Sequence, residues 1–421
     1  SPQGIIYSED LWLITSPINI IDCDIDGNVN FDNAIFEGPV SFNETFFQGN
    51  ASFKGSRFGK IADFQYARFM GTSDFRKSKF PYLSTFFNAT FMGNAYFDFS
   101  QFNEKADFKE AYFNASTSFE ESQFNERAEF QGSIFAEDID FWSSQFDGAA
   151  RFWNAEFRGD ALFNDAMFSK DVEFYEASFS GDAKFYNVTF LGILDLAASS
   201  NEGYQRTKFL KDLILDNTKI NIIRLSYAEF SNRSIISLNG SNFQNFLAPW
   251  SALDGRGSYD NGTFLSLIRN YNELGWFEDA DDCHYQYRWI GQDQKHWSWA
   301  KLRDVLSLIS MGYGVRPTYG FISWFIVVLF FTIIYYKTRC IGELQCIKYG
   351  PSLFLESLYQ SALIFTTNAK GINWKGGYRI KLDCINHDIR IKYKYLGVIE
   401  GIIGWLLMTL FLVTLAKMLA R

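Results

Sequence analysis

Residues 31–53 read FDNAIFEGPVSFNETFFQGNASF, and this stretch contains two copies of the pattern that fills the first half of the chain. Each copy has a pair of phenylalanines five residues apart, and the copies follow one another every eleven residues. The first pair is Phe31 and Phe36, and the fifteenth, reached with no break in phase, is Phe185 and Phe190. A period this strict predicts a structural repeat.

A small residue, most often Ala, Ser, Thr or Val, stands two places before almost every one of these phenylalanines, beginning with Ala34, Val40, Thr45 and Ala51. Neither the 3.6-residue period of a helix nor the alternation of a strand explains spacings of five and six. A chain that turns a corner every five or six residues does explain them. The phenylalanine and the small residue then both point inward, and rings stack on rings from one coil to the next.

The motif of a small residue, any residue, Phe and two further residues resembles the pentapeptide-repeat family, in an eleven-residue variant. The resemblance implies a right-handed, four-sided β-helix over residues 29–190. With about 22 residues per coil and ~4.8 Å between stacked strands, this region gives roughly seven coils and a rod about 35 Å long. An inward stack of Phe, Ala and Ser is a scaffold, so we expect no enzymatic activity and no cofactor.

Charge divides the 421-residue chain into two parts. Residues 1–290 hold 23 Lys and Arg against 41 Asp and Glu, a net charge of −18, whereas residues 291–421 hold 16 against 7, a net charge of +9. An acidic soluble part is therefore joined to a basic, apolar part. Nucleic-acid binding by the acidic part is disfavoured, and the three scattered His residues predict no metal site.

The pattern changes along the chain in a way that divides it into five segments. The repeat becomes irregular after Phe190, with an insertion near residues 197–207, and helical spacing interrupted at Gly275 follows a Gly-rich loop. We expect an N-terminal cap (1–28), a β-helix (29–247), a loop and helical neck (248–298), an interfacial amphipathic helix (299–316) and a two-span membrane domain (317–421).

Two long apolar segments predict membrane spans. Residues 319–336 contain no charge, and residues 396–416 contain one, Glu400. Both lengths suit a hydrocarbon core of about 30 Å. Residues 354–365, between them, are too short to span and too apolar for an exposed loop, which predicts a re-entrant helix.

A span, a short helix ending in Phe-Thr-Thr, a polar turn and a second span resemble the two-transmembrane pore-loop ion channels. The segments Gly312-Tyr313-Gly314-Val315-Arg316-Pro317 and Glu400-Gly401-Ile402-Ile403-Gly404-Trp405 add to this resemblance. It implies a pore or filter at six residues: Thr366, Thr367, Asn368, Ala369, Lys370 and Gly371. Potassium channels have Val-Gly-Tyr-Gly after the two threonines, so the Lys370 found here argues against potassium selectivity.

Two functions remain open at this point, with a third weaker one. The first is a channel or channel-derived pore whose solenoid senses or docks, and the second is a cell-surface scaffold that uses a channel-like fold as its anchor. The third is an acidic, DNA-mimicking rod. The expected partners are membrane lipid, further copies of the chain with a tetramer favoured, and a protein bound on the solenoid, but no nucleic acid.

Two features bear on which side of the membrane the solenoid occupies. Asn-X-Ser/Thr sequons, which are glycosylation acceptors in exported domains, all precede the spans. The loop of residues 337–394 carries ten Lys and Arg, which favours a cytoplasmic position. The resemblance to potassium channels would instead place the solenoid in the cytoplasm. The two features above favour an extracellular solenoid in the cell membrane, with the C-terminus on the same side. The eight sequons begin at Asn43, Asn50, Asn88, Asn114, Asn187, Asn232, Asn239 and Asn261.

Overall fold

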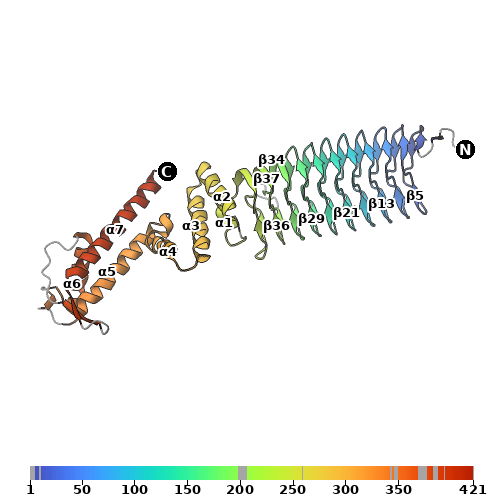
Figure 1. Cartoon of the computed structure of the whole chain (residues 1–421). Helices are drawn as coiled ribbons and strands as arrows, with labels where there is room; N and C mark the ends of the chain where they lie inside the picture. The colour runs from blue at the N-terminus through green and yellow to red at the C-terminus, as the bar shows by residue number, and fades with distance from the viewer. Residues whose placement is uncertain are drawn as a thin grey trace. The chain divides into compact units, whose positions relative to one another are not determined.

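The chain folds into two compact units, Ser1–Ala280 and Asp281–Arg421 (Figure 1). The first contains a parallel β-solenoid, and the second contains helices and one β-hairpin. The computed structural model describes residues 5–8, 11–197, 206–257, 259–341, 344–345, 349–367, 377–382, 387–392 and 394–420.

Four short strands form each coil of the solenoid. In the first regular coil these are β6 (Ala34–Phe36), β7 (Val40–Ser41), β8 (Phe46–Phe47) and β9 (Ala51–Ser52). The next coil begins with β10 (Arg57–Phe58), which pairs in parallel with β6 so that Phe58 lies beside Phe36, 22 residues earlier. The set recurs with this register as far as β33 (Ala183–Lys184). The four-sided parallel solenoid expected from the repeat is confirmed.

Stacked phenylalanine rings fill the solenoid. The ring of Phe108 lies 4.8 Å from that of Phe86 and 5.0 Å from that of Phe130, with interplanar angles of 1° and 3°. All three side chains are fully buried. Aromatic pairs contribute about 0.5–1.5 kcal/mol beyond the area they bury, so the stack adds to stability at every coil.

The small residue before the second phenylalanine is also fully buried, and its size has a specific cause. Where it is Ser or Thr, its hydroxyl donates a hydrogen bond to a carbonyl of the preceding coil: Ser100 to the oxygen of Phe75, and Ser133 to that of Phe108, each at 2.7 Å. Where it is Ala, as at Ala111, the position is equally buried. A larger side chain would push the coils apart.

One corner in every eleven residues has a left-handed backbone. The residue two places after the first phenylalanine of each pair has φ between +52° and +62° where it is not glycine, and +66° to +70° where it is. These corners are Asn33, Glu44, Gly55, Tyr66, Lys77, Asn88, Phe99, Glu110, Glu121, Gly132, Ser143, Asn154, Asp165, Glu176 and Asn187.

The solenoid is longer than the regular repeat at its N-terminal end. Strand β2 (Leu11–Ile14) pairs in parallel with β6, and β1 (Ile5–Ser8) folds back antiparallel to β2. Part of the segment expected to be a separate cap (residues 1–28) is therefore a coil without the phenylalanine pair.

The solenoid also continues past the last phenylalanine pair. Strand β35 (Lys208–Phe209) pairs with β32 (Ser178–Phe179) 30 residues earlier instead of 22, which confirms an insertion of eight residues. Two of the sheets contain ten strands each, one per coil, so the solenoid has about ten coils instead of the seven expected for residues 29–190.

Helix α2 (Asn261–Glu273) closes the C-terminal end of the solenoid. It packs on the last strand, β40 (Asn242–Leu247), after the short helix α1 (Trp250–Leu253). The side-chain amide of Asn270 donates to the carbonyl of Phe246 and accepts from its N–H, both at 2.9 Å. One asparagine thus satisfies backbone groups that a further strand would otherwise bond.

The second unit contains most of α3 (Phe277–Asp293), then α4 (Trp299–Met311), the 3₁₀ turn η1 (Gly312–Gly314), α5 (Thr318–Thr338), α6 (Pro351–Thr367) and α7 (Lys394–Leu419). Gly275, with φ of +75°, separates α2 from α3 as expected. Strands β41 (Gly377–Leu382) and β42 (His387–Lys392) form an antiparallel hairpin between α6 and α7 that the sequence analysis had not predicted.

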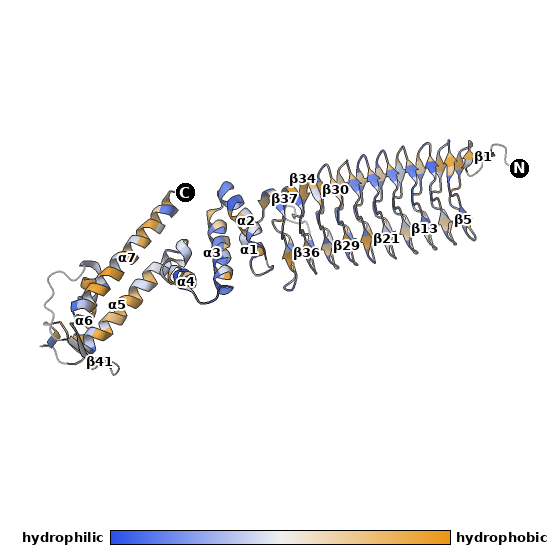
Figure 2. Ribbon diagram, in the orientation of Figure 1, coloured by the Kyte–Doolittle hydropathy of each residue, from blue (hydrophilic) through white to orange (hydrophobic). Residues whose placement is uncertain are grey.

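Helices α5 and α7 are long and apolar enough to cross a membrane (Figure 2). Only 28% of the apolar window of each is buried within the chain. A core helix of a soluble domain would be mostly buried, so the exposed apolar side chains favour lipid or further copies of the chain as their surroundings.

Candidate functional site

A buried carboxylate joins three helices of the second unit, α5, α6 and α7. Glu400, on α7, is fully buried. Tyr335 on α5 donates its hydroxyl to Oε2, and Ser361 on α6 donates its hydroxyl to Oε1, both at 2.5 Å. The sequence analysis had singled out Glu400 as the polar residue of the second span, but it had not predicted these partners.

Apolar side chains surround this carboxylate. The cluster beside it contains Phe331, Tyr335, Cys340, Ile341, Leu344, Leu353 and Ile364. Within the described residues Glu400 forms no ion pair with Lys, Arg or His. Because burying a polar group without hydrogen bonds costs several kcal/mol, the hydrogen bonds from Tyr335 and Ser361 offset part of the cost of burying this side chain.

Small residues let α7 approach α6 closely. Gly397, Gly401 and Gly404 form a buried line along α7, interrupted by Glu400. A Cβ atom added at Gly404 would lie 2.3 Å from the carbonyl oxygen of Phe365 on α6. Close contacts of this kind are the usual way in which helices associate in membranes, where apolar burial contributes little.

Helix α6 buries polar as well as apolar side chains on one face and exposes mainly apolar side chains on the other. Ser357, Gln360 and Ser361 are buried, whereas Leu355 and Tyr359 are about 60% exposed. At 17 residues the helix extends beyond the expected range of 354–365 at both ends. Its polar face is fixed inside the unit, so its apolar face is available for lipid or another subunit.

The structure describes only the first two of the six proposed filter residues. Thr366 and Thr367 are exposed in the last turn of α6, and their hydroxyls bond back to the carbonyls of Ala362 and Leu363 at 2.9 and 2.6 Å. Asn368, Ala369, Lys370 and Gly371 lie outside the described residues. The two threonines therefore end a helix here.

The segment before α5 is fixed by charged and aromatic contacts. Arg316 bonds Asp282 at 3.0 Å and lies over the ring of Tyr285 at 4.1 Å. Asp304 on α4 is buried and bonds Lys295 at 2.5 Å and Arg288 at 2.9 Å. The hydrogen bond from Lys295 holds the pKa of Asp304 below its usual range. These contacts join α3, α4 and the start of α5.

The sequons occupy structural positions in the repeat. Asn88 and Asn187 are exposed left-handed corners, and the Asn50 side-chain oxygen accepts from the N–H of Thr72 at 2.9 Å. The hydroxyl residues of the sequons at Asn232 and Asn261 are buried and donate to carbonyls of the preceding coil. The solenoid itself therefore favours Asn and Ser or Thr at these spacings.

Three carboxyl groups lie close together on one face of the solenoid: Asp98, Glu120 and Asp140. Burial raises the pKa of each. Repulsion adds to this, from Asp140 and Asp98 at Glu120, from Asp98 at Asp140 and from Asp74 at Asp98. Among the described residues, no group of three or more His, Cys, Asp or Glu is arranged to hold a metal ion. Because the pKa values of these groups are raised, we expect the cluster to make the stability of the solenoid depend on pH.

Comparison with known proteins identifies the repeat region. A family model described as Pentapeptide repeats (9 copies) matches residues 31–79, 108–156 and 152–200. Neither the curated proteins nor the solved structures contain a match to the chain. Pentapeptide repeats therefore form the β-solenoid, and all three matches lie before the helical unit.

Proposed function

We propose that this chain is the subunit of an oligomeric membrane pore that carries a large solenoid head. The observation that carries the proposal is the Glu400 site, which holds a short helix, α6, between two helices long enough to cross a membrane. Helix α6, with 17 residues, is shorter than α5 and α7, which have 21 and 26, and lies at the lower limit of the roughly 17–25 residues that a span uses. A short helix held this way could bring the chain that follows it to a pore axis.

Closed symmetry is the usual way for a subunit with two spans to enclose an aqueous path. Two features support assembly: α5 and α7 expose large apolar side chains such as Phe325 and Trp405, and α6 exposes Tyr359 beside its buried polar face. The resemblance to pore-loop channels favours four copies. The solenoid head acts as a sensor or docking element in this proposal.

The residues after α6 decide which ions such a pore passes. Four Lys370 ammonium groups near one axis would repel cations, since like charges a few ångströms apart interact by about 4 kcal/mol even near a protein surface. We therefore propose a pore that is not selective for potassium and that favours anions.

Planar-bilayer recording of the purified full-length protein tests this function. In a salt gradient, we expect wild-type current with a reversal potential on the anion side, and a shift toward the cation side in Lys370→Gln. Lys394→Gln, which removes the same charge at the start of α7, is the matched control and should leave the reversal potential unchanged. Absence of current from the reconstituted oligomer would contradict the proposal.

A second candidate is a scaffold whose working part is the solenoid. The observation that favours it is the presence of exposed aromatic side chains on solenoid coils, including Trp142, Trp153 and Tyr186, which are 39–50% exposed. Interfaces between proteins are enriched in such residues. If wild-type protein carries no current while Trp142→Ala and Tyr186→Ala abolish binding of a solenoid partner, the scaffold function replaces the pore.

A further inference from the structure

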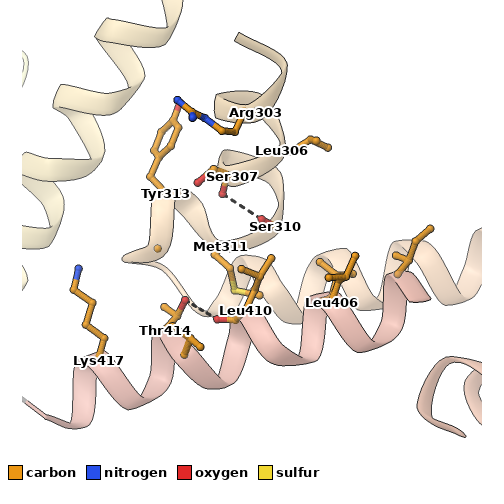
Figure 3. A pocket seen from close by; sticks show the side chains of 14 residues that line it. Arg303, Leu306, Ser307, Ser310, Met311, Tyr313, Leu406, Leu410, Thr414 and Lys417 are labelled. Carbon is orange, nitrogen blue, oxygen red and sulfur yellow. Dashed lines mark hydrogen bonds between the residues drawn. The ribbon is translucent and has the colours of Figure 1, made fainter. Parts of the chain in front are cut away.

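A groove runs between α4 and α7 in the second unit (Figure 3). Its volume is about 580 Å³. Its walls are mainly apolar side chains from both helices, among them Leu306, Met311, Leu406 and Leu410. Because α7 is long and apolar enough to cross a membrane, a groove along its C-terminal half is accessible to lipid.

Two basic side chains line the same groove. Arg303 projects from α4, and Lys417 from the last turn of α7 toward the side on which Arg303 and Tyr313 lie (Figure 3). No Asp or Glu lines the groove. Neither Arg303 nor Lys417 forms an ion pair within the described part of the chain, although other basic residues of the unit do so. An apolar groove with two cations that form no ion pair among the described residues fits a ligand that is itself amphipathic and anionic.

We propose that this groove binds an anionic phospholipid, with one acyl chain along the Leu406–Leu410 side of α7 and the anionic headgroup on the side of the groove where Arg303 and Lys417 lie. Arginine binds phosphate through its planar fork of N–H donors, and lysine binds it as a compact charge. The exposed ends of both side chains can reach a headgroup while their stems stay along the apolar walls.

A second copy of the chain fits the groove less well. It would cover the apolar walls but would have to supply carboxylates to Arg303 and Lys417. The second unit, residues 281–421, has nine Asp and Glu against seventeen Lys and Arg. Of these nine, Asp282 and Asp304 are already paired with cations and Glu400 is buried among three helices. The compensating anion is therefore expected from the membrane.

Native mass spectrometry of the full-length protein, titrated with phosphatidylglycerol in detergent, tests the site. Arg303→Gln/Lys417→Gln should weaken phosphatidylglycerol binding at least tenfold. The control, Lys301→Gln/Lys394→Gln, removes two charges from the same two helices outside the groove and should bind as wild type does. Leu410→Trp, which fills the groove and keeps both charges, should also weaken binding, so the site can be tested without changing charge.

Four outcomes would overturn the proposal. Equal phosphatidylglycerol binding by all the variants would place the lipid elsewhere. Equal binding of phosphatidylcholine would remove the role of the two cations. Competition by free glycerol phosphate at the same concentration would identify a phosphate site without an acyl chain. Dissociation of the oligomer by Leu410→Trp, with lipid binding intact, would identify the groove as a contact between subunits.

Discussion

The left-handed corner of each repeat determines which residues the solenoid accepts there. A non-glycine residue in this conformation loses roughly 1–2 kcal/mol of conformational stability. Asn and Asp adopt it more readily than other non-glycine residues do. The fifteen corners from Asn33 to Asn187 include four Asn, two Gly and no β-branched residue. The left-handed backbone conformation therefore determines which residue types occur at the corners, and the outward-facing contacts of their side chains do not.

A β-branched residue at a corner should therefore destabilise the solenoid. We expect Glu121→Val to lower the free energy of unfolding by about 1–3 kcal/mol, because valine clashes with its own backbone at φ of +52°. Glu121→Asn should cause no loss. Gln123→Val, at an outward position of strand β22 (Gln123–Phe124), is the control. Equal denaturant midpoints for the two valine variants would contradict the corner argument.

Loss of a ring should matter more inside the stack than at its end. Phe108 is stacked on both sides, whereas Phe31 is partly exposed and stacks on Phe53 at 5.4 Å. We expect Phe108→Ala to cost about 3–5 kcal/mol and Phe31→Ala less, because end coils fray. The denaturant midpoint of solenoid unfolding measures both, and equally small effects would count against a continuous stack.

The sequence predicted which residues of the repeat point inward, but it did not predict the left-handed backbone of the corner residues. The phenylalanine pairs and their small neighbours repeat in residue type, so their burial follows from the period alone. The corner repeats in backbone conformation, and residues as different as Lys77, Phe99 and Glu110 adopt it. The recurring Gly and Asn at this position were the available signal.

At the scale of one solenoid face, the carboxyl cluster should make stability depend on pH. The pKa values of Asp98, Glu120 and Asp140 are raised in the folded state by burial and by repulsion from neighbouring carboxylates. The folded chain therefore binds these protons more tightly than the unfolded chain does. The stabilisation is complete below the unfolded pKa values and is lost as pH rises through the folded ones.

Glu120→Gln should thus raise the melting temperature at neutral pH. It should also make the fall in melting temperature from acidic to neutral pH smaller than in the wild type. Asp160→Asn is the opposite control: burial raises the pKa of Asp160, but the hydrogen bonds from Lys184 and from the N–H of Asp182 outweigh this and hold it below the usual range. Its removal should lower stability at neutral pH, where the carboxylate is charged. Parallel melting curves across pH for wild type and Glu120→Gln would refute the cluster's role.

In the helical unit, Glu400 should act through its two hydroxyl partners. Glu400→Ala leaves the hydroxyls of Tyr335 and Ser361 without their acceptor, which costs about 1–3 kcal/mol for a buried group. Glu400→Gln keeps an acceptor and should lose less. Ile399→Ala, at the exposed neighbouring position of α7, is the control. Thermal unfolding in detergent should rank these variants, and an unchanged midpoint for Glu400→Ala would exclude a role in holding the helices.

Element types were predictable where one pattern extends over many residues. Both long apolar helices and the break at Gly275 follow from hydropathy and helical spacing. The roles of α2 and of the hairpin do not, because they depend on what each segment meets in space. In the sequence, Asn270 is indistinguishable from other polar residues of a helix. In the structure, its side-chain amide forms hydrogen bonds with the last strand of the solenoid.

For the whole molecule, the sequence indicates the parts more clearly than their activity. Stacked Phe rings and apolar helices are recognisable by repetition, whereas a filter depends on a few residues. Of the six residues predicted there, Asn368, Ala369, Lys370 and Gly371 lie outside the described part of the chain. The proposed ion selectivity is therefore inferred from the charge of Lys370, and the reversal-potential measurement tests it.

The position of the solenoid relative to the membrane gives the last prediction. All eight sequons precede the spans, and the loop of residues 337–394 is rich in Lys and Arg, which by the positive-inside tendency is cytoplasmic. We expect an extracellular solenoid with glycans at exposed sequons such as Asn88 and Asn232. In intact-mass spectra of protein from its native host, Asn88→Gln should then remove the mass of one glycan.

Asn154→Gln is the matched control for that substitution. Asn154 is also an exposed left-handed corner, with φ of +53° against +52° at Asn88, but no Ser or Thr follows it at the second position. Its replacement should change the mass only by that of the side chain. Protease added to whole cells should also reach an extracellular solenoid. A spectrum without hexose-containing adducts, together with protection of the solenoid in whole cells, would place it in the cytoplasm instead.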